Sequence, residues 1–149
     1  MNDSLMKELQ ATFKGVEIVG MNDTRTAINV PSVSVPMVLR KLKDSGLQHL
    51  SLVSCVDWIE EDKIEVVYVL TSYMKDDEAY PDHDPWHVFL KTKIPRDEPK
   101  LKSVIDVFEN AEPYEREIHE LFGVHFEGHP RLTPLFLIQK YEIPPFRKD

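Results

Sequence analysis

Two neighbouring stretches rich in β-branched and aromatic residues, Leu50–Trp58 and Ile64–Tyr73, constrain the fold more than any other feature of this chain. Such residues favour extended strands. The charged run Glu60–Lys63 separates the two stretches and predicts a loop, so we expect an antiparallel hairpin. A third stretch of the same kind, Trp86–Ile94, follows the polar, proline-marked segment Lys75–Pro85 and predicts a further strand.

The first part of the chain predicts two helices and two short strands. Leucine and phenylalanine residues four positions apart predict an amphipathic helix over residues 4–14. Strand-like runs at 16–20 and 26–30 follow it. A second helix is expected to begin near Pro36, which suits a first helical turn, and to end at Gly46.

Apolar spacing after the third stretch predicts two more helices. The first would use one helix face made of Leu101, Val104, Ile105 and Phe108. The second would span residues 113–122, with Pro113 in its first turn and Gly123 at its C-terminal cap.

Composition limits the class of protein. A chain of 149 residues is large enough for one domain with a real core. Its net charge of -8 argues against binding to nucleic acid or to an anionic lipid surface. It has no apolar run of the roughly 20 residues that span a bilayer, and its first residues do not resemble a signal peptide. We therefore expect a cytosolic or cytosol-facing protein.

The single cysteine, Cys55, restricts the chemistry of the chain. It allows no intrachain disulfide, and an iron–sulfur cluster usually needs about four thiolate ligands. Its place in an apolar stretch predicts a buried, unreactive thiol. The five glycines form no phosphate-binding loop. We expect no cofactor in this chain.

The segment Glu115–Pro130 is the most chemically dense part of the chain and allows two interpretations. His119, His125 and His129 with a nearby glutamate could form a metal or acid–base site. The alternative is a rigid docking surface, because arginine beside aromatic residues is typical of interface hot spots. The spacing matches no established metal pattern, which favours docking.

The C-terminal residues predict an extended tail. Leu132–Ile138 is apolar, and the consecutive prolines Pro144 and Pro145 exclude a regular helix. Such a tail is suited to lie on another subunit. We therefore expect a domain over residues 1–130 and a partner-docking tail over residues 131–149.

These motifs resemble a known family. Glu115-Arg116-Glu117, Leu121–Val124, Phe126–Pro130 and the terminal Pro145–Asp149 are similar to the 30-kilodalton subunit family of respiratory complex I. The same family supplies a subunit of membrane-bound [NiFe] hydrogenases and related sulfur-reducing complexes. The pattern E-R-E, then F-G, then F-x-G-H-P is highly specific.

The resemblance implies an α+β two-layer domain with a mostly antiparallel or mixed sheet and helices on one face. It implies a non-catalytic subunit that docks on a hydrogenase-like large subunit, beside a cluster-bearing small subunit and, indirectly, the membrane arm. A [NiFe] centre, iron–sulfur clusters or a flavin would belong to those partners, on the cytoplasmic side of the membrane. The implied interface residues are Glu115, Arg116, Glu117, Gly123, Phe126, Gly128, His129, Pro130, Pro145, Arg147 and Lys148.

Departures from the complex I pattern favour the hydrogenase branch. Arg131-Leu132-Thr133-Pro134 stands where a basic pair usually precedes the apolar run, and His119 stands where an acidic residue is common. Two other functions stay open at this point. One is a small metal-dependent enzyme that uses His119, His125 and His129, and the other is a generic adaptor for a soluble partner.

Overall fold

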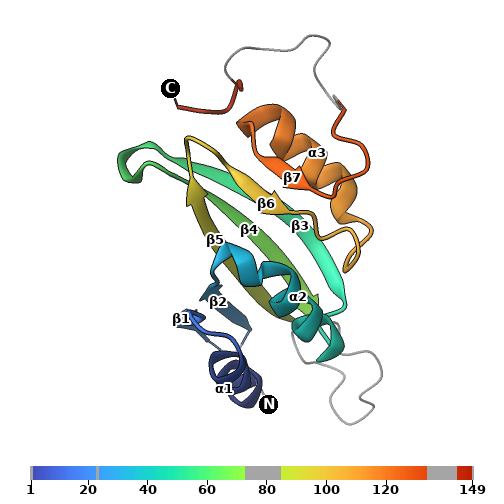
Figure 1. Cartoon of the computed structure of the whole chain (residues 1–149). Coiled ribbons are helices and arrows are strands. Elements are labelled where there is room, and N and C mark those ends of the chain that lie inside the picture. The colour runs from blue at the N-terminus through green and yellow to red at the C-terminus, as the bar shows by residue number, and fades with distance from the viewer. Residues whose placement is uncertain (1, 23, 73–84, 134–143, 149) are drawn as a thin grey trace.

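The computed structural model describes residues 2–22, 24–72, 85–133 and 144–148 (Figure 1). Its elements are α1 (Asn2–Thr12), β1 (Glu17–Met21), β2 (Arg25–Asn29), η1 (Ser32–Ser34), α2 (Val35–Asp44), β3 (His49–Trp58), η2 (Ile59–Glu61), β4 (Lys63–Ser72), β5 (Trp86–Pro95), β6 (Lys100–Lys102), α3 (Ala111–Phe122) and β7 (His125–Glu127). Five strands form a mixed sheet in the order β1-β2-β5-β4-β3, and β6 pairs with β7. This architecture confirms the α+β fold class.

The predicted hairpin is present. β3 and β4 pair antiparallel from Trp58 opposite Lys63 to His49 opposite Thr71. The turn between them contains η2 and ends at Asp62, whose φ of 55° lies in the left-handed region that aspartate tolerates better than most residues. β4 also pairs with β5 along its length. The three long strands among those that the sequence predicted therefore form one continuous antiparallel part of the sheet.

The parallel pairing of β2 with β5 sets the strand order. Thr26 lies opposite Val88, and Ile28 lies opposite Leu90. The sequence predicted both strands but not that they are neighbours, because a residue pattern identifies a strand without naming its partner. This pairing attaches the unit formed by α1, β1 and β2 to the three long strands.

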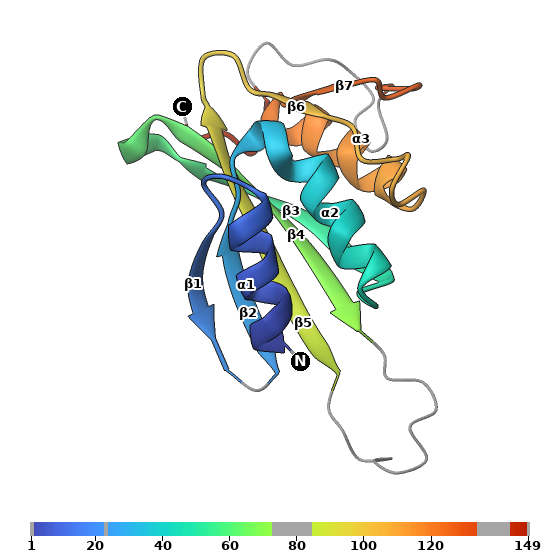
Figure 2. The ribbon, with the colours of Figure 1, turned by 60° about the horizontal axis from the view of Figure 1, so that its bottom comes forward.

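Helices cover one face of the sheet. Figure 2 shows α1 and α2 lying over the same side of the strands, with α3 beside α2. α2 confirms the prediction of a helix through Pro36, and its apolar stripe is buried: Val35, Val38, Leu39 and Leu42. They belong to one buried cluster with the strand residues Ile64, Val66, Tyr68 and Leu70, all 0% exposed. The core lies between this helical layer and the sheet.

The helix predicted from Leu101, Val104, Ile105 and Phe108 is wrong. Leu101 belongs to the short strand β6, and turns occupy residues 105–107. The backbone N–H of Ser103 bonds to the Glu127 carbonyl, and that of Val104 bonds to the Glu115 carboxylate. These tertiary hydrogen bonds take the place of helical ones. The apolar residues therefore have the spacing of a helix face although the backbone that carries them is not helical.

α3 confirms the predicted helix over 113–122. It ends at Gly123, whose φ of 79° is left-handed and whose N–H bonds to the His119 carbonyl at 3.0 Å. The strand β7 that follows was not predicted, since three residues are too few for a periodic signal. It pairs parallel with β6, with Phe126 opposite Leu101.

Candidate functional site

Glu115, the first residue of the dense segment, is fully buried. Its carboxylate accepts hydrogen bonds from the Ser103 hydroxyl at 2.7 Å and from the Val104 N–H at 2.8 Å. Burial raises the pKa of Glu115, and these two hydrogen bonds act in the opposite direction. Glu115 therefore ties α3 to the turn after β6, inside the chain.

The His129 side chain is buried against the first turn of α3. Its Nδ1 accepts the Arg131 N–H at 2.9 Å, so the neutral ring carries its proton on Nε2. That nitrogen donates to the Glu112 carbonyl at 3.2 Å and lies 4.0 Å from the Glu115 carboxylate. The Gly128–Arg131 turn is thereby held in one place relative to the helix.

Arg116 holds the chain that leaves this turn. Its Nε and Nη2 donate to the carbonyl and the hydroxyl of Thr133, both at 3.3 Å. Its Nη1 lies 3.3 Å from the Glu112 carboxylate, one helical turn away. The guanidinium thus connects α3 to the segment that follows the Gly128–Arg131 turn.

Residues Pro144–Lys148 lie against the other end of α3. The Phe146 N–H donates to the Leu121 carbonyl at 2.9 Å, and the Phe146 ring meets Phe122 edge-on at 5.8 Å between centroids. A Cβ at Gly123 would lie 2.8 Å from Pro144 Cγ. Glycine at this position therefore both ends the helix and leaves room for the C-terminal segment.

A buried ion pair anchors the same segment to the sheet. Arg96 binds the Asp57 carboxylate through Nε at 2.6 Å and Nη2 at 2.8 Å. The Lys148 N–H donates to Asp57 at 2.7 Å, and Arg147 donates to the Arg96 carbonyl at 3.3 Å. Hydrogen bonds from the Arg96 guanidinium hold the pKa of Asp57 below its usual range, with the Lys148 N–H contributing in the same direction.

Arg96 was missed by the sequence analysis. It stands between Pro95 and Asp97 with no motif around it, and its partner Asp57 is distant in the sequence. The usable signal was Asp57 itself, a carboxylate inside an apolar strand, because a buried carboxylate requires a donor.

Comparison with known proteins decides the family. Residues 28–149 match the family model of the respiratory-chain NADH dehydrogenase 30 Kd subunit. The chain belongs to this family. The resemblance drawn from the E-R-E and F-x-G-H-P motifs is confirmed.

Relatives of this 30 Kd subunit family cover different parts of the chain. The C subunit of F(420)H(2) dehydrogenase from Methanosarcina mazei is 45% identical over 60% of this chain, which corresponds to 51% of that protein. The chain thus aligns with only about half the length of this relative. The C subunit of NADH-quinone oxidoreductase from Moorella thermoacetica is 29% identical over 99% of this chain and 93% of its own length.

Two solved structures share this fold over most or nearly all of the chain. A chain in the structure of the membrane-bound sulfane sulfur reductase, an archaeal respiratory membrane complex, superposes with a TM-score of 0.82, at 28% identity, over 99% of this chain and 84% of that one. The trypsin-resistant fragment of Nqo5 gives a TM-score of 0.72, at 26% identity, over 88% and 98%. In the present chain, the helices that the structure describes include none long and apolar enough to cross a bilayer.

The family motif residues divide into an internal and an external group. Glu115, Phe126 and the side chain of His129 are buried, and Arg116, Gly123 and Arg147 are half-buried. Gly128, Pro130, Pro145 and Lys148 are exposed, and Glu117 is half-buried on α3. Since Glu115 and Phe126 have almost no accessible surface, their part in any interface is to shape the backbone. Direct contact with a partner stays a prediction for the external group.

The three histidines of the alternative metal site are not brought together. His119 Nδ1 bonds to the Val124 carbonyl at 2.8 Å, and His129 faces Glu112 and Arg131. His119 and His125 have ring centroids 6.4 Å apart. Among the described residues, no three histidine, cysteine or acidic side chains cluster as metal ligands. The geometry lends this alternative no support.

Cys55 lies half-buried on β3. Burial, with help from the nearby Asp57 carboxylate, raises the pKa of its thiol to about 12. The thiol is therefore protonated near neutral pH, which agrees with the expectation of an unreactive cysteine.

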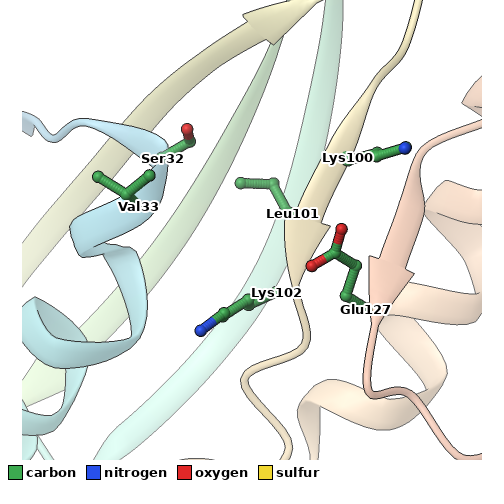
Figure 3. Close-up of a pocket in the computed structure, with 6 residues that line it drawn as sticks. All are labelled: Ser32, Val33, Lys100, Leu101, Lys102 and Glu127. Carbon is green, nitrogen blue, oxygen red and sulfur yellow. The ribbon is translucent and has the colours of Figure 1, made fainter.

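A hollow of about 270 Å³ lies between η1 and β6 (Figure 3). It is lined by Ser32, Val33, Lys100, Leu101, Lys102 and Glu127. Lys102 and Glu127 also border a second hollow beside Gly128 and Pro130. The exposed turn of the family motif therefore stands next to a grooved and charged surface.

Proposed function

We propose that this chain is a non-catalytic structural subunit of a membrane-associated redox complex that couples electron transfer to ion translocation. It docks on a hydrogenase-like large subunit, beside a cluster-bearing small subunit, on the cytoplasmic side of the membrane. It reaches the membrane arm only through these partners. The [NiFe], iron–sulfur or flavin centres of such a complex would lie in the partner chains.

The observation that carries this proposal is the similarity over 99% of the chain to a subunit of an archaeal respiratory membrane complex. Similarity of this extent supports a shared way of packing in a complex, because it includes the elements that surround α3. The family match over residues 28–149 points in the same direction.

The geometry around α3 supports docking at this end of the molecule. The Gly128–Arg131 turn is fixed at the first turn of α3, and Pro144–Lys148 is fixed at the last turn. Internal hydrogen bonds hold both segments, so their exposed residues need little further ordering when a partner binds. We call this surface the α3 end, meaning the end of the molecule at which α3 lies. It is defined by Glu117, Gly128, Pro130, Pro145 and Lys148.

Purification of the tagged chain from membranes of its native host tests the proposal. A co-purifying large subunit with two paired-cysteine motifs would support a [NiFe] hydrogenase. A similar large subunit without those cysteines, joined by a flavin-bearing subunit, would support an NADH dehydrogenase. Recovery of a lone protein with bound metal would overturn the proposal and favour the histidine-based enzyme.

Charge reversal at the α3 end sharpens this test. Glu117→Arg and Lys148→Glu change exposed or half-buried side chains, and the Lys148 contact to Asp57 uses only the backbone. We expect both variants to retain less large subunit while the chain stays folded. Lys14→Glu is the matched control, since this exposed lysine follows α1, away from the α3 end. If all three variants retain the large subunit equally, this surface is not the docking surface.

A further inference from the structure

The face of the five-stranded sheet that points away from the helices carries an apolar row across four strands. Leu52 lies opposite Val69, Val69 lies opposite Phe89, and Phe89 lies opposite Ala27. Leu52 is 40% exposed and the other three are half-buried. The described helices lie on the opposite side (Figure 2). We call this surface the outer sheet face.

The apolar surface extends beyond this row. Val67 and Val56 continue it toward Trp58, which is 41% exposed. Lys93 Nζ lies 5.7 Å from the centre of the Trp58 ring and 2.7 Å from the Glu61 carboxylate, which places these groups together at this end. A solvated face of an antiparallel sheet normally alternates to polar residues. Here Val67 and Val69 make the middle of β4 apolar on both faces, and Phe89 continues this apolar surface onto β5, as in a sheet that is covered on both sides.

Charges around the row indicate what kind of surface would cover it. The outward positions of the described strands hold four basic and two acidic residues: Arg25, Lys63, Lys91 and Lys93, against Glu17 and Glu65. Lys93 is already paired with Glu61 in the turn after β3, so one positive charge remains in excess, on a chain whose net charge is -8. A partner with apolar residues bordered by carboxylates is complementary to it. A second copy of the chain is not, because the same positive surplus would face itself.

We propose that the outer sheet face is a second docking surface and that it binds an acidic, apolar surface of another subunit. We assign it a different chain from the one at the α3 end, because α3 lies on the helical side of the sheet and the outer sheet face points the opposite way (Figure 2). The inference relies on the proposed function only in placing the chain in a multisubunit complex. It assigns the chain a bridging role between two partners.

Photo-crosslinking in the intact complex tests the assignment. The reactive residue p-benzoylphenylalanine replaces Phe89, at the centre of the row, and the complex is purified from the native host after irradiation. We expect a crosslink to one other subunit, within a peptide rich in acidic and apolar residues. The control position is Met37 on α2, which is 56% exposed on the helical side and should not capture that peptide.

A charge variant supplies the second readout. Lys91→Glu should lower retention of the crosslinked subunit by roughly tenfold, with Lys14→Glu as the control. Thermal unfolding of both variants shows whether the chain is folded. If Lys91→Glu unfolds, the Phe89 crosslink decides, since it needs no change of charge.

Each other outcome overturns the proposal. A crosslink from position 89 to a second copy of the chain, or to another segment of the same chain, would show that a different occupant covers the face. An intact complex without any crosslink from Phe89 shows that the face is not an interface, and leaves the proposed function standing. If the control position Met37 captures the same peptide equally well, the crosslink from Phe89 is not specific to the outer sheet face. Failure to recover any complex with the tagged chain contradicts the proposed function and overturns this inference with it.

Discussion

Asp57 and Glu115 are buried carboxylates whose pKa values are displaced in opposite directions. Asp57 faces the Arg96 guanidinium, which favours the charged form, while burial dominates at Glu115 and favours the neutral form. The difference lies in the donor each side chain meets: a cation for Asp57, and a hydroxyl and an amide for Glu115. The two residues therefore respond differently to pH.

The Asp57 pair predicts a pH-dependent stability. Because the folded-state pKa of Asp57 is lowered, its contribution is complete above the unfolded-state pKa of about 3.9 and is lost as the pH falls further. We expect Asp57→Asn to lower the free energy of unfolding by about 3 kcal/mol at pH 7. The difference from wild type should shrink below about pH 4, where the Asp57 carboxyl of the unfolded wild-type chain begins to bind a proton. Urea unfolding at several pH values measures both quantities.

Asp106→Asn is the control for this prediction, since Asp106 is exposed. It should leave the free energy of unfolding nearly unchanged at neutral pH. A loss in Asp57→Asn that is the same at pH 7 and pH 3 would assign the effect to packing rather than to charge.

Tyr68 predicts a stabilising substitution. Its hydroxyl is buried and has no hydrogen-bond partner among the described residues. An unsatisfied buried hydroxyl costs about 1 to 3 kcal/mol, so Tyr68→Phe should leave the free energy of unfolding unchanged or raise it. Tyr114→Phe is the matched control, because the Tyr114 hydroxyl donates to the Ser51 carbonyl at 3.1 Å. Chemical denaturation that ranks Tyr68→Phe below Tyr114→Phe would show that Tyr68 has a partner.

At the scale of elements, α3 is the part of the fold on which the family motif converges. The Glu112 carbonyl at its start holds His129, and the Leu121 carbonyl at its end holds Phe146. Glu115 joins its buried side to the turn after β6. The helix thus positions both exposed segments of the α3 end.

Gly123 predicts a coupling between the helix end and the C-terminal segment. Gly123→Ala should cost about 1 to 2 kcal/mol for the left-handed backbone and should also displace Pro144, which its Cβ would approach to 2.8 Å. Gly46→Ala is the matched control, because Gly46 has φ of 108° and nothing within 4 Å of the added Cβ. Limited proteolysis should therefore cut the C-terminal residues faster in Gly123→Ala than in Gly46→Ala. Equal rates would show that Pro144 adjusts without releasing the segment.

For the whole molecule, the strand order predicts the pattern of hydrogen exchange. β4 lies between β3 and β5, whereas β1 pairs with β2 at one edge of the sheet. Amides of β4 should exchange only through global unfolding, and those of β1 through local opening. Hydrogen exchange measured by mass spectrometry compares the two strands within one sample. Equal protection of β1 and β4 would mean that the sheet opens as a single unit.

The predictable part of the fold is the part that local patterns encode. The β3–β4 hairpin, β5, α2 and α3 were predicted because their residues repeat with the period of one element and end at proline, glycine or charged residues. The predicted helix at 101–108 failed for the opposite reason. Its apolar spacing is local, but its backbone donors bond to Glu115 and Glu127, which follow it in the chain.

The candidate site was predicted as a set of residues but not as an arrangement. The motif identified Glu115, Arg116, His129 and Arg147, and the structure shows that each is bonded within the chain. Arg96 and Thr133 complete these contacts and carry no motif of their own. Residues of this kind are important because of what they contact in the folded chain, so no sequence pattern identifies them.

Local sequence patterns were sufficient to predict the three long strands and the helices around Pro36 and Pro113, and the motifs pointed to the family. These follow from residue type and spacing over a few turns, where local preferences act. Three features became known from the folded chain alone: β2 lies beside β5, Arg96 binds Asp57, and some motif residues are internal. Such contacts join residues far apart in the chain, and their energy depends on burial and geometry that exist only once the sheet has formed.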